Sequence, residues 1–165
     1  MLLNRQLLNI LTQLLHLKVE TCGVLKLVNG KVVLEIHTSH NDKNNECIHN
    51  YYAEHIFHTH VLSNKSYPSA PDIVKVLKNS KIVTSLIVCH WGIWEICSLK
   101  KQLFTPSEQE YIVHTISKML YPIREYKNFD GNVARYIQDI EEKYKVFGLR
   151  IKFTSWSDIG KIVLN

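Results

Sequence analysis

The stretch EHIFHTHVLSNKSYPSAPD, residues 54–72, decides what this chain of 165 residues can build. It contains two histidines, His58 and His60, that are two residues apart, and a carboxylate, Asp72, twelve residues further on. Because side chains alternate between the faces of a strand, a strand over about 52–59 places both imidazoles on one face at its end. Three protein ligands that leave one coordination position open are typical of a catalytic zinc site.

Hydrophobic periodicity on either side of this stretch predicts an α/β fold. Apolar residues at three- and four-residue steps indicate helices over about 2–17, 72–77, 105–119 and 132–146. Alternating or short apolar runs indicate strands over about 21–28, 31–38, 52–59, 83–90, 92–99 and 149–153. The pair Asn29-Gly30 predicts a tight hairpin between the first two strands, and the polar residues 39–50 predict a loop. We therefore expect a mixed, mostly antiparallel sheet flanked by helices.

Length and composition fit one domain with a short appendage. Hydrophobic residues make up 45% of the chain, which is enough for a core, and the net charge of +5 comes from dispersed lysines and arginines. Dispersed charge indicates a solvated surface rather than nucleic-acid binding. We expect a domain over residues 1–127 and a helix-strand appendage over 128–165, whose apolar side chains would dock on the domain or on a protein partner.

The chain shows none of the usual sequence features of export or membrane insertion. No run approaches 18 consecutive apolar residues, and the N-terminus lacks the basic start, apolar core and cleavage site of a signal peptide. The four cysteines form no CxxC pair, and Cys22, Cys89 and Cys97 lie in apolar runs, where a free cysteine behaves as a small hydrophobe. We therefore expect a cytoplasmic, intracellular protein with reduced thiols and without a membrane span.

A zinc hydrolase also needs a base that takes a proton from water and a donor for the developing oxyanion. Glu20 is the candidate base, because it lies where the first helix passes into the first strand, with Gly23 allowing another segment to come close. Glu35 is the competing acid in a strand-like run, but it lacks this glycine context and ranks behind Glu20.

Taken in order along the chain, these motifs resemble the JAMM (JAB/MPN+) metalloprotease domain. The matching segments, over about residues 2–120, are Glu20-Thr-Cys-Gly23-Val-Leu25, His58-Thr-His60, Pro68-Ser69-Ala-Pro-Asp72 and Gly92-Ile-Trp94. The resemblance implies a JAB/MPN-like α/β fold and a Zn²⁺ ion held by His58, His60 and Asp72. It implies Glu20 as the general acid/base and Ser69 as the hydroxyl that stabilises the tetrahedral intermediate. The reaction it implies is hydrolysis of a peptide or isopeptide bond at the C-terminal tail of ubiquitin or a ubiquitin-like protein.

The chain departs from the family pattern at two points in one loop. Val61 stands where the family has a proline after the second histidine. Eight residues separate His60 from Ser69, where the usual spacer has seven. One added loop residue costs little chain entropy, so the ligands can still converge. The valine removes a stiffener of the loop rather than a ligand.

Each site residue also has a plain structural interpretation. His58 and His60 could be two polar residues on the solvent-facing side of a strand. Ser69 and Asp72 could be a helix-capping pair, since a serine three residues before an acid is typical of a helix start. Glu20 could be an ordinary surface residue at the end of a helix.

Two further histidines lie near the motif. His55 is an odd number of residues from His58 and should face away from it on a regular strand, which indicates a structural role. His90 ends a strand beside Trp91, where packing is a more common role than support of the site.

The alternative function for such a chain is a non-catalytic one. Relatives of the JAMM domain that act as MPN-type scaffolds or structural components of larger assemblies commonly lose zinc ligands. This chain keeps all five site positions, which favours the enzyme.

Overall fold

The computed structural model describes residues 5–17, 19–37, 53–61, 66–100, 102–124, 126 and 129–159. Its helices are α1 (Arg5–Leu14), α2 (Ala70–Lys78), α3 (Pro106–Leu120) and α4 (Gly131–Tyr144), with short 3₁₀ turns η2 (Tyr121–Ile123) and η3 (Lys145–Phe147). Its strands are β1 (Cys22–Val28), β2 (Lys31–His37), β3 (His55–His60), β4 (Thr84–Cys89), β5 (Gly92–Ser98) and β6 (Leu149–Ser155). Each helix and strand expected from periodicity is therefore present, while the loop expected over 39–50 lies outside the described residues.

The six strands form one sheet in the order β2-β1-β3-β4-β5-β6. All neighbouring pairs are antiparallel except β3 and β4, which are parallel. The turn between β1 and β2 has positive φ at both central residues, 50° at Asn29 and 74° at Gly30, as a tight hairpin requires. The coarse prediction of a mixed, mostly antiparallel sheet flanked by helices is confirmed.

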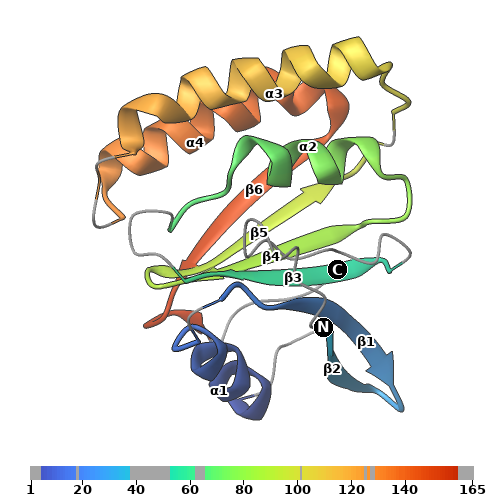
Figure 1. Ribbon diagram of the computed structural model, residues 1–165, viewed down its shortest axis with the longest axis vertical. Coiled ribbons are helices and arrows are strands. Elements are labelled where there is room, and N and C mark those ends of the chain that lie inside the picture. The colour runs from blue at the N-terminus through green and yellow to red at the C-terminus, as the bar shows by residue number, and fades with distance from the viewer. Residues whose placement is uncertain are drawn as a thin grey trace.

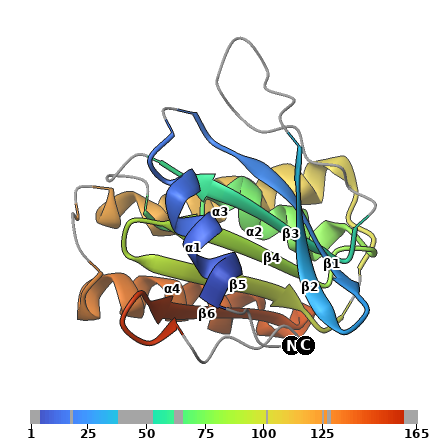
Figure 2. The ribbon, with the colours of Figure 1, turned by 90° about the horizontal axis from the view of Figure 1, so that it is seen from below.

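Helices cover both faces of this sheet (Figure 1). α2, α3 and α4 lie on one face, and α1 crosses the other, as the view from below shows (Figure 2). The alternation of β3 divides its side chains between two cores: Ile56 packs in the cluster under α2, and Phe57 packs in the cluster with α1.

The parallel pair is joined by a crossover that contains α2. Parallel neighbours cannot be joined by a tight turn, so the chain leaves β3, passes through α2 on one face and returns as β4. This brings the N-terminus of α2 next to the carboxyl end of β3. Open sheets of this kind commonly bind ligands outside the carboxyl ends of their strands.

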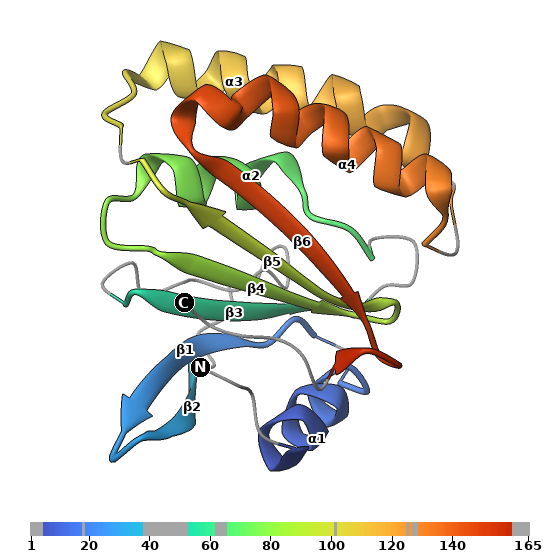
Figure 3. The same cartoon turned by 180° about the vertical axis from the view of Figure 1, so that it is seen from behind.

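The last elements of the chain share the sheet and core of the earlier ones. β6 pairs with β5 along its whole length, and α4 lies over it (Figure 3). The buried residues of this part that join the cluster under α2 are Val133, Ile137, Ile140, Tyr144 and Leu149. The described residues from 129 to 159 therefore complete the domain on this side.

The longest helix in the described part of the chain, α3, has 15 residues, and none of the described helices is long and apolar enough to cross a membrane. Cys89 and Cys97 are free, as expected. Cys22, however, is disulfide-bonded, so the expectation of a free thiol at this position is wrong. An apolar run shows that a cysteine is buried, but it does not show whether another cysteine comes within bonding distance.

Candidate metal centre

β3 carries both histidines of the motif on the face that α2 covers. Ile56, His58 and His60 share this face because they are two residues apart, and Ile56 packs into the core below α2. The rings of His58 and His60 lie side by side with their centroids 4.9 Å apart. His55 belongs to the alternate set with Phe57, which packs on the α1 face.

The first turn of α2 places the carboxylate. Ser69 is the N-cap, and its backbone N–H and hydroxyl both donate to Asp72 Oδ2, at 2.8 and 2.5 Å. The backbone N–H of Asp72 donates back to the Ser69 hydroxyl at 3.3 Å. The capping arrangement is therefore present, and it fixes the rotamer of the Asp72 side chain. The cap engages Oδ2, while Oδ1 lies next to His58 Nε2.

The two histidines and the aspartate converge at the end of β3. His58 Nε2 lies 3.2 Å from Asp72 Oδ1, and His60 Nε2 lies 3.5 Å from Asp72 Oδ2. The two Nε2 atoms are 3.0 Å apart. All three side chains are at least nine-tenths buried, with exposures of 5%, 7% and 8%. This group could hold a metal ion.

Two of the separations between donor atoms are close to those expected around a tetrahedral ion. With ligand bonds of about 2.0–2.1 Å, the edges of a tetrahedron are roughly 3.3–3.4 Å. His58 Nε2 lies 3.0 Å from His60 Nε2 and 3.2 Å from Asp72 Oδ1, both near this length, whereas the 3.5 Å separation from His60 involves the other carboxylate oxygen, Oδ2. With one ligand atom from each residue, all three atoms lie within 4.8 Å of one another. Two imidazoles and one carboxylate also form a donor set that suits zinc and leaves a fourth position open.

Burial and mutual contact shift the pKa values of two of the three donors, His58 and Asp72. Burial lowers the pKa of His58, which favours the neutral imidazole. Burial opposes ionisation of Asp72, but contacts with His58 and His60 outweigh this and hold the pKa of the carboxyl well below its usual range. Metal ligands must be neutral imidazoles and ionised carboxylates, so each of these two shifts is in the direction that favours metal binding.

The candidate base, Glu20, lies two residues before the neighbouring strand, β1. Cys22 on β1 is opposite His58, and the pairing continues through Thr21, whose carbonyl accepts from the Thr59 N–H at 2.9 Å. Glu20 precedes Thr21, so this register continued by one more residue would set the Glu20 backbone opposite His60. Its side chain is half-buried and forms no hydrogen bond or ion pair with any other described residue.

Gly23 has the close backbone approach that the sequence suggested. A Cβ at this position would lie 2.0 Å from the Glu35 carbonyl oxygen and 2.7 Å from the Phe57 ring. Only glycine fits there, so Gly23 lets β1 lie flat between β2 and β3.

Glu35 lies on β2, which is separated from β3 by β1. Its carboxylate is half exposed and pairs with Lys26, and its Oε1 lies 3.2 Å from His37 Nε2. The hydrogen bond and positive charge of Lys26 lower the pKa of Glu35, which makes it a poor base. The structure does not bring it to the histidine pair.

Cys89 on β4 is a strand neighbour of a candidate ligand, because it pairs with His60. Burial raises the pKa of its thiol to about 11, so the sulfur stays protonated at neutral pH and is a poor ligand. It donates to the Ser66 carbonyl at 3.2 Å. Trp94 donates to the same carbonyl at 2.9 Å, a contact that the sequence did not indicate, because an alternating Trp in a strand is simply expected in the core.

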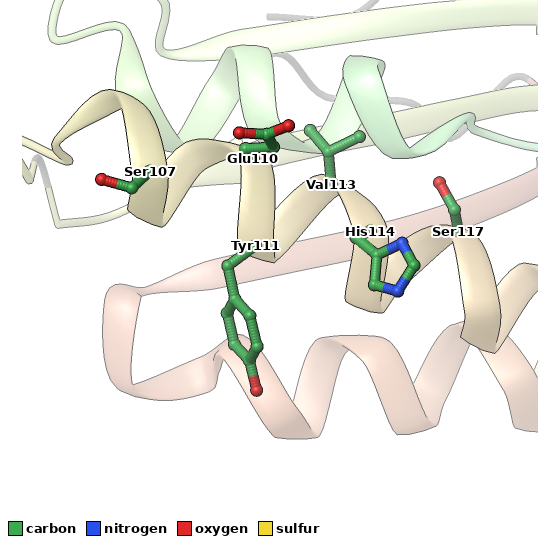
Figure 4. A pocket seen from close by; sticks show the side chains of 6 residues that line it. All are labelled: Ser107, Glu110, Tyr111, Val113, His114 and Ser117. Carbon is green, nitrogen blue, oxygen red and sulfur yellow. The ribbon is translucent and has the colours of Figure 1, made fainter.

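A separate hollow of about 530 Å³ lies on the outer surface of α3 (Figure 4). It is lined by Ser107, Glu110, Tyr111, Val113, His114 and Ser117. All of these residues come from one helix, and the hollow includes none of the converging donors. Among the described residues, the candidate metal ligands therefore lie at the end of β3 and not in this hollow.

Comparison with models of protein families, with curated proteins and with solved structures found no match to the chain. The interpretation of the site rests on its own residues and geometry.

Proposed function

We propose that this chain is a zinc-dependent metallopeptidase of the JAMM type, with a JAB/MPN-like fold. The observation that carries the proposal is the convergence of three buried donors, His58, His60 and Asp72, at the carboxyl end of β3. Glu20 at the level of His60 and Ser69 at the start of α2 add the two other groups that such hydrolysis needs. The order of these groups along the chain is also that of the JAMM motif.

The proposed substrate is a peptide or isopeptide bond at the C-terminal tail of ubiquitin or a ubiquitin-like protein. This part of the proposal comes from the resemblance of the motifs. A tail of this kind is extended, and extended peptides can pair with an edge strand through backbone hydrogen bonds. β2 and β6 are the two edge strands of the described sheet.

In the proposed mechanism, His58, His60 and Asp72 would hold a zinc ion, which would supply the charge that acidifies a water molecule and polarises the scissile carbonyl. Glu20 accepts the proton of the attacking water and later gives it to the departing amine. The Ser69 hydroxyl donates a hydrogen bond to the oxyanion that develops on the carbonyl. In the substrate-free structure this hydroxyl donates to Asp72, so it must turn from Asp72 to the substrate during the reaction.

Replacement of the base tests the proposal, with Glu35→Gln as a matched control on the neighbouring strand. Purified protein should carry about one zinc per chain by elemental analysis and should cleave at least one member of a panel of ubiquitin-like fusions and chains. Glu20→Gln should keep the zinc and lose roughly 10²–10⁴-fold in rate. Glu35→Gln should keep both zinc and rate, because Glu35 pairs with Lys26 on β2.

Two outcomes would contradict the proposal in different ways. If wild-type protein carried no zinc and His58→Ala changed none of its properties, there would be no metal centre. Protein with bound zinc that cleaves nothing in the panel would favour the non-catalytic MPN-type scaffold instead.

A further inference from the structure

The turn between β4 and β5 lies against the loop that connects the histidines to Ser69. Cys89 and Gly92 pair across this turn, and Cys89 also pairs with His60 on β3. The turn therefore sits beside the point where the chain leaves β3. Two residues of the turn region, His90 and Trp94, form hydrogen bonds with the two described ends of the loop, at Val61 and Ser66.

The first contact holds the residue that follows the second histidine. His90 Nε2 lies 2.9 Å from the carbonyl oxygen of Val61. A carbonyl can only accept, so the ring nitrogen carries the proton and donates it. Val61 stands where the JAMM motif has a proline, and this hydrogen bond restrains the same backbone by another means.

The second contact holds the start of the segment that leads into α2. Trp94 Nε1 donates to the Ser66 carbonyl at 2.9 Å. The indole is itself fixed, since it is 1% exposed and packs on Phe129 and Phe153 with ring centroids 5.6 and 4.6 Å away. The Ser66 residue is fully buried, so its carbonyl depends on this donor and on the Cys89 thiol.

A short and stiff segment connects Ser66 to Ser69, the proposed oxyanion donor. Only two residues, Tyr67 and Pro68, separate Ser66 from Ser69. Pro68 is buried and its ring fixes φ, which limits how far Ser69 can move once Ser66 is held. Ser69 in turn fixes Asp72 through the capping hydrogen bonds.

We infer that His90 and Trp94 are positioning residues of the metal centre, which set its geometry by holding both ends of the loop between His60 and Ser69. The inference rests on the proposed function, since it concerns zinc binding by that same site. The β4–β5 turn then restrains the loop between His60 and Ser69, which lacks the family's proline and has one more residue than the family spacer.

Zinc affinity tests this inference, measured by competition with a chromogenic chelator on full-length protein well below its unfolding temperature. His90→Leu removes an exposed donor and should weaken zinc binding about 10–100-fold, the usual cost of losing an outer hydrogen bond around a metal. His90→Gln restores a side-chain N–H and should recover most of the affinity. Trp94→Phe should weaken binding by a similar factor.

Trp156→Phe is the matched control for the tryptophan. Its indole also donates to a backbone carbonyl of this hairpin, that of Cys89 at 3.0 Å, but it packs on the α1 face. It should lower the thermal midpoint without changing zinc affinity, which is the behaviour of a purely structural residue.

The outcomes separate this inference from the proposed function. Wild-type protein that binds no zinc overturns both. Wild-type protein that binds zinc, with His90→Leu and His90→Gln binding it equally tightly, overturns the inference alone, and this holds even if Trp94→Phe does not fold. Weaker zinc binding by His90→Leu, with affinity recovered in His90→Gln, supports the inference.

Discussion

Two described helices of this molecule begin with the same capping box, and one of them contributes a residue to the candidate metal centre. α2 begins with Ser69 and Asp72, and α3 begins with Thr105 and Glu108, each with a proline in the first turn. The N-cap N–H donates to the acid at 2.8 and 2.7 Å, and the hydroxyl donates at 2.5 and 2.7 Å. The returning N–H bond is 3.3 Å long in both. Locally the two helix starts are alike.

The difference lies in what each acid meets beyond its own helix. Asp72 is 6% exposed and faces His58 and His60 at the end of β3. Glu108 is exposed, and Thr105 is its only partner among the described residues. The same local motif thus only caps the start of a helix at α3, whereas at α2 it also completes a set of candidate metal donors. The difference arises because the crossover from β3 to β4 sets α2 beside two imidazoles.

Removal of the two acids should have the largest and most unequal effect. Asp72→Ala should lower zinc affinity by more than the roughly 10–100-fold that outer-shell changes cost, because it deletes a ligand. It should also cost the metal-free protein about 1–3 kcal/mol, since buried imidazole nitrogens lose a partner. Glu108→Ala should bind zinc like wild type and be only slightly less stable. Chelator competition and urea unfolding in EDTA measure the two quantities.

Metal-dependent stabilisation provides the check on this first prediction. Zinc that binds only folded protein raises the unfolding temperature. The rise should occur in wild type and Glu108→Ala and be absent from Asp72→Ala. An equal rise in all three proteins would mean that Asp72 is a helix cap and nothing more.

Replacement of the two hydroxyls should separate capping from catalysis. Ser69→Ala and Thr105→Ala each remove an N-cap side chain, so each should cost about 1 kcal/mol of stability. Only Ser69→Ala should slow peptide hydrolysis, by roughly 10²–10³-fold as for loss of an oxyanion donor, with zinc still bound. Rate measurements on the same substrate would reject this role for Ser69 if both variants kept wild-type activity.

The elements and the histidine face followed from local sequence. Periodicity of two residues put His58 and His60 on one face, and Asn29-Gly30 gave the hairpin with its two positive φ angles. The role of Asp72 could not be decided in that way. The segments around residues 69–72 and 105–108 carry the same signature of hydroxyl, proline and acid, and only the long-range pairing of β3 with β4 distinguishes them.

Contacts between distant segments account for the rest of what the sequence left open. The strand pattern at 149–153 predicted β6 but not its pairing with β5, because alternation does not name a neighbour. The N–H of Trp94 reaches the carbonyl of Ser66, 28 residues away in the sequence, a contact that the strand pattern around Trp94 does not indicate. The disulfide bond of Cys22 is likewise a contact that the local sequence around Cys22 does not indicate.

Acid should remove the contributions of the two capping acids at different pH, and this is the smallest effect expected. Hydrogen bonds from Thr105 lower the pKa of Glu108, and contacts with His58 and His60 hold the pKa of Asp72 well below its usual range in spite of burial. A carboxyl with a lowered folded-state pKa stabilises the fold above its unfolded pKa of about 4, and the contribution is lost as pH falls through the folded value. The stability difference between wild type and Asp72→Asn should therefore persist to lower pH than the difference between wild type and Glu108→Gln. Urea unfolding in EDTA between pH 6 and pH 2.5 measures both differences, and the reverse order would show that the histidines do not hold Asp72 in its charged form.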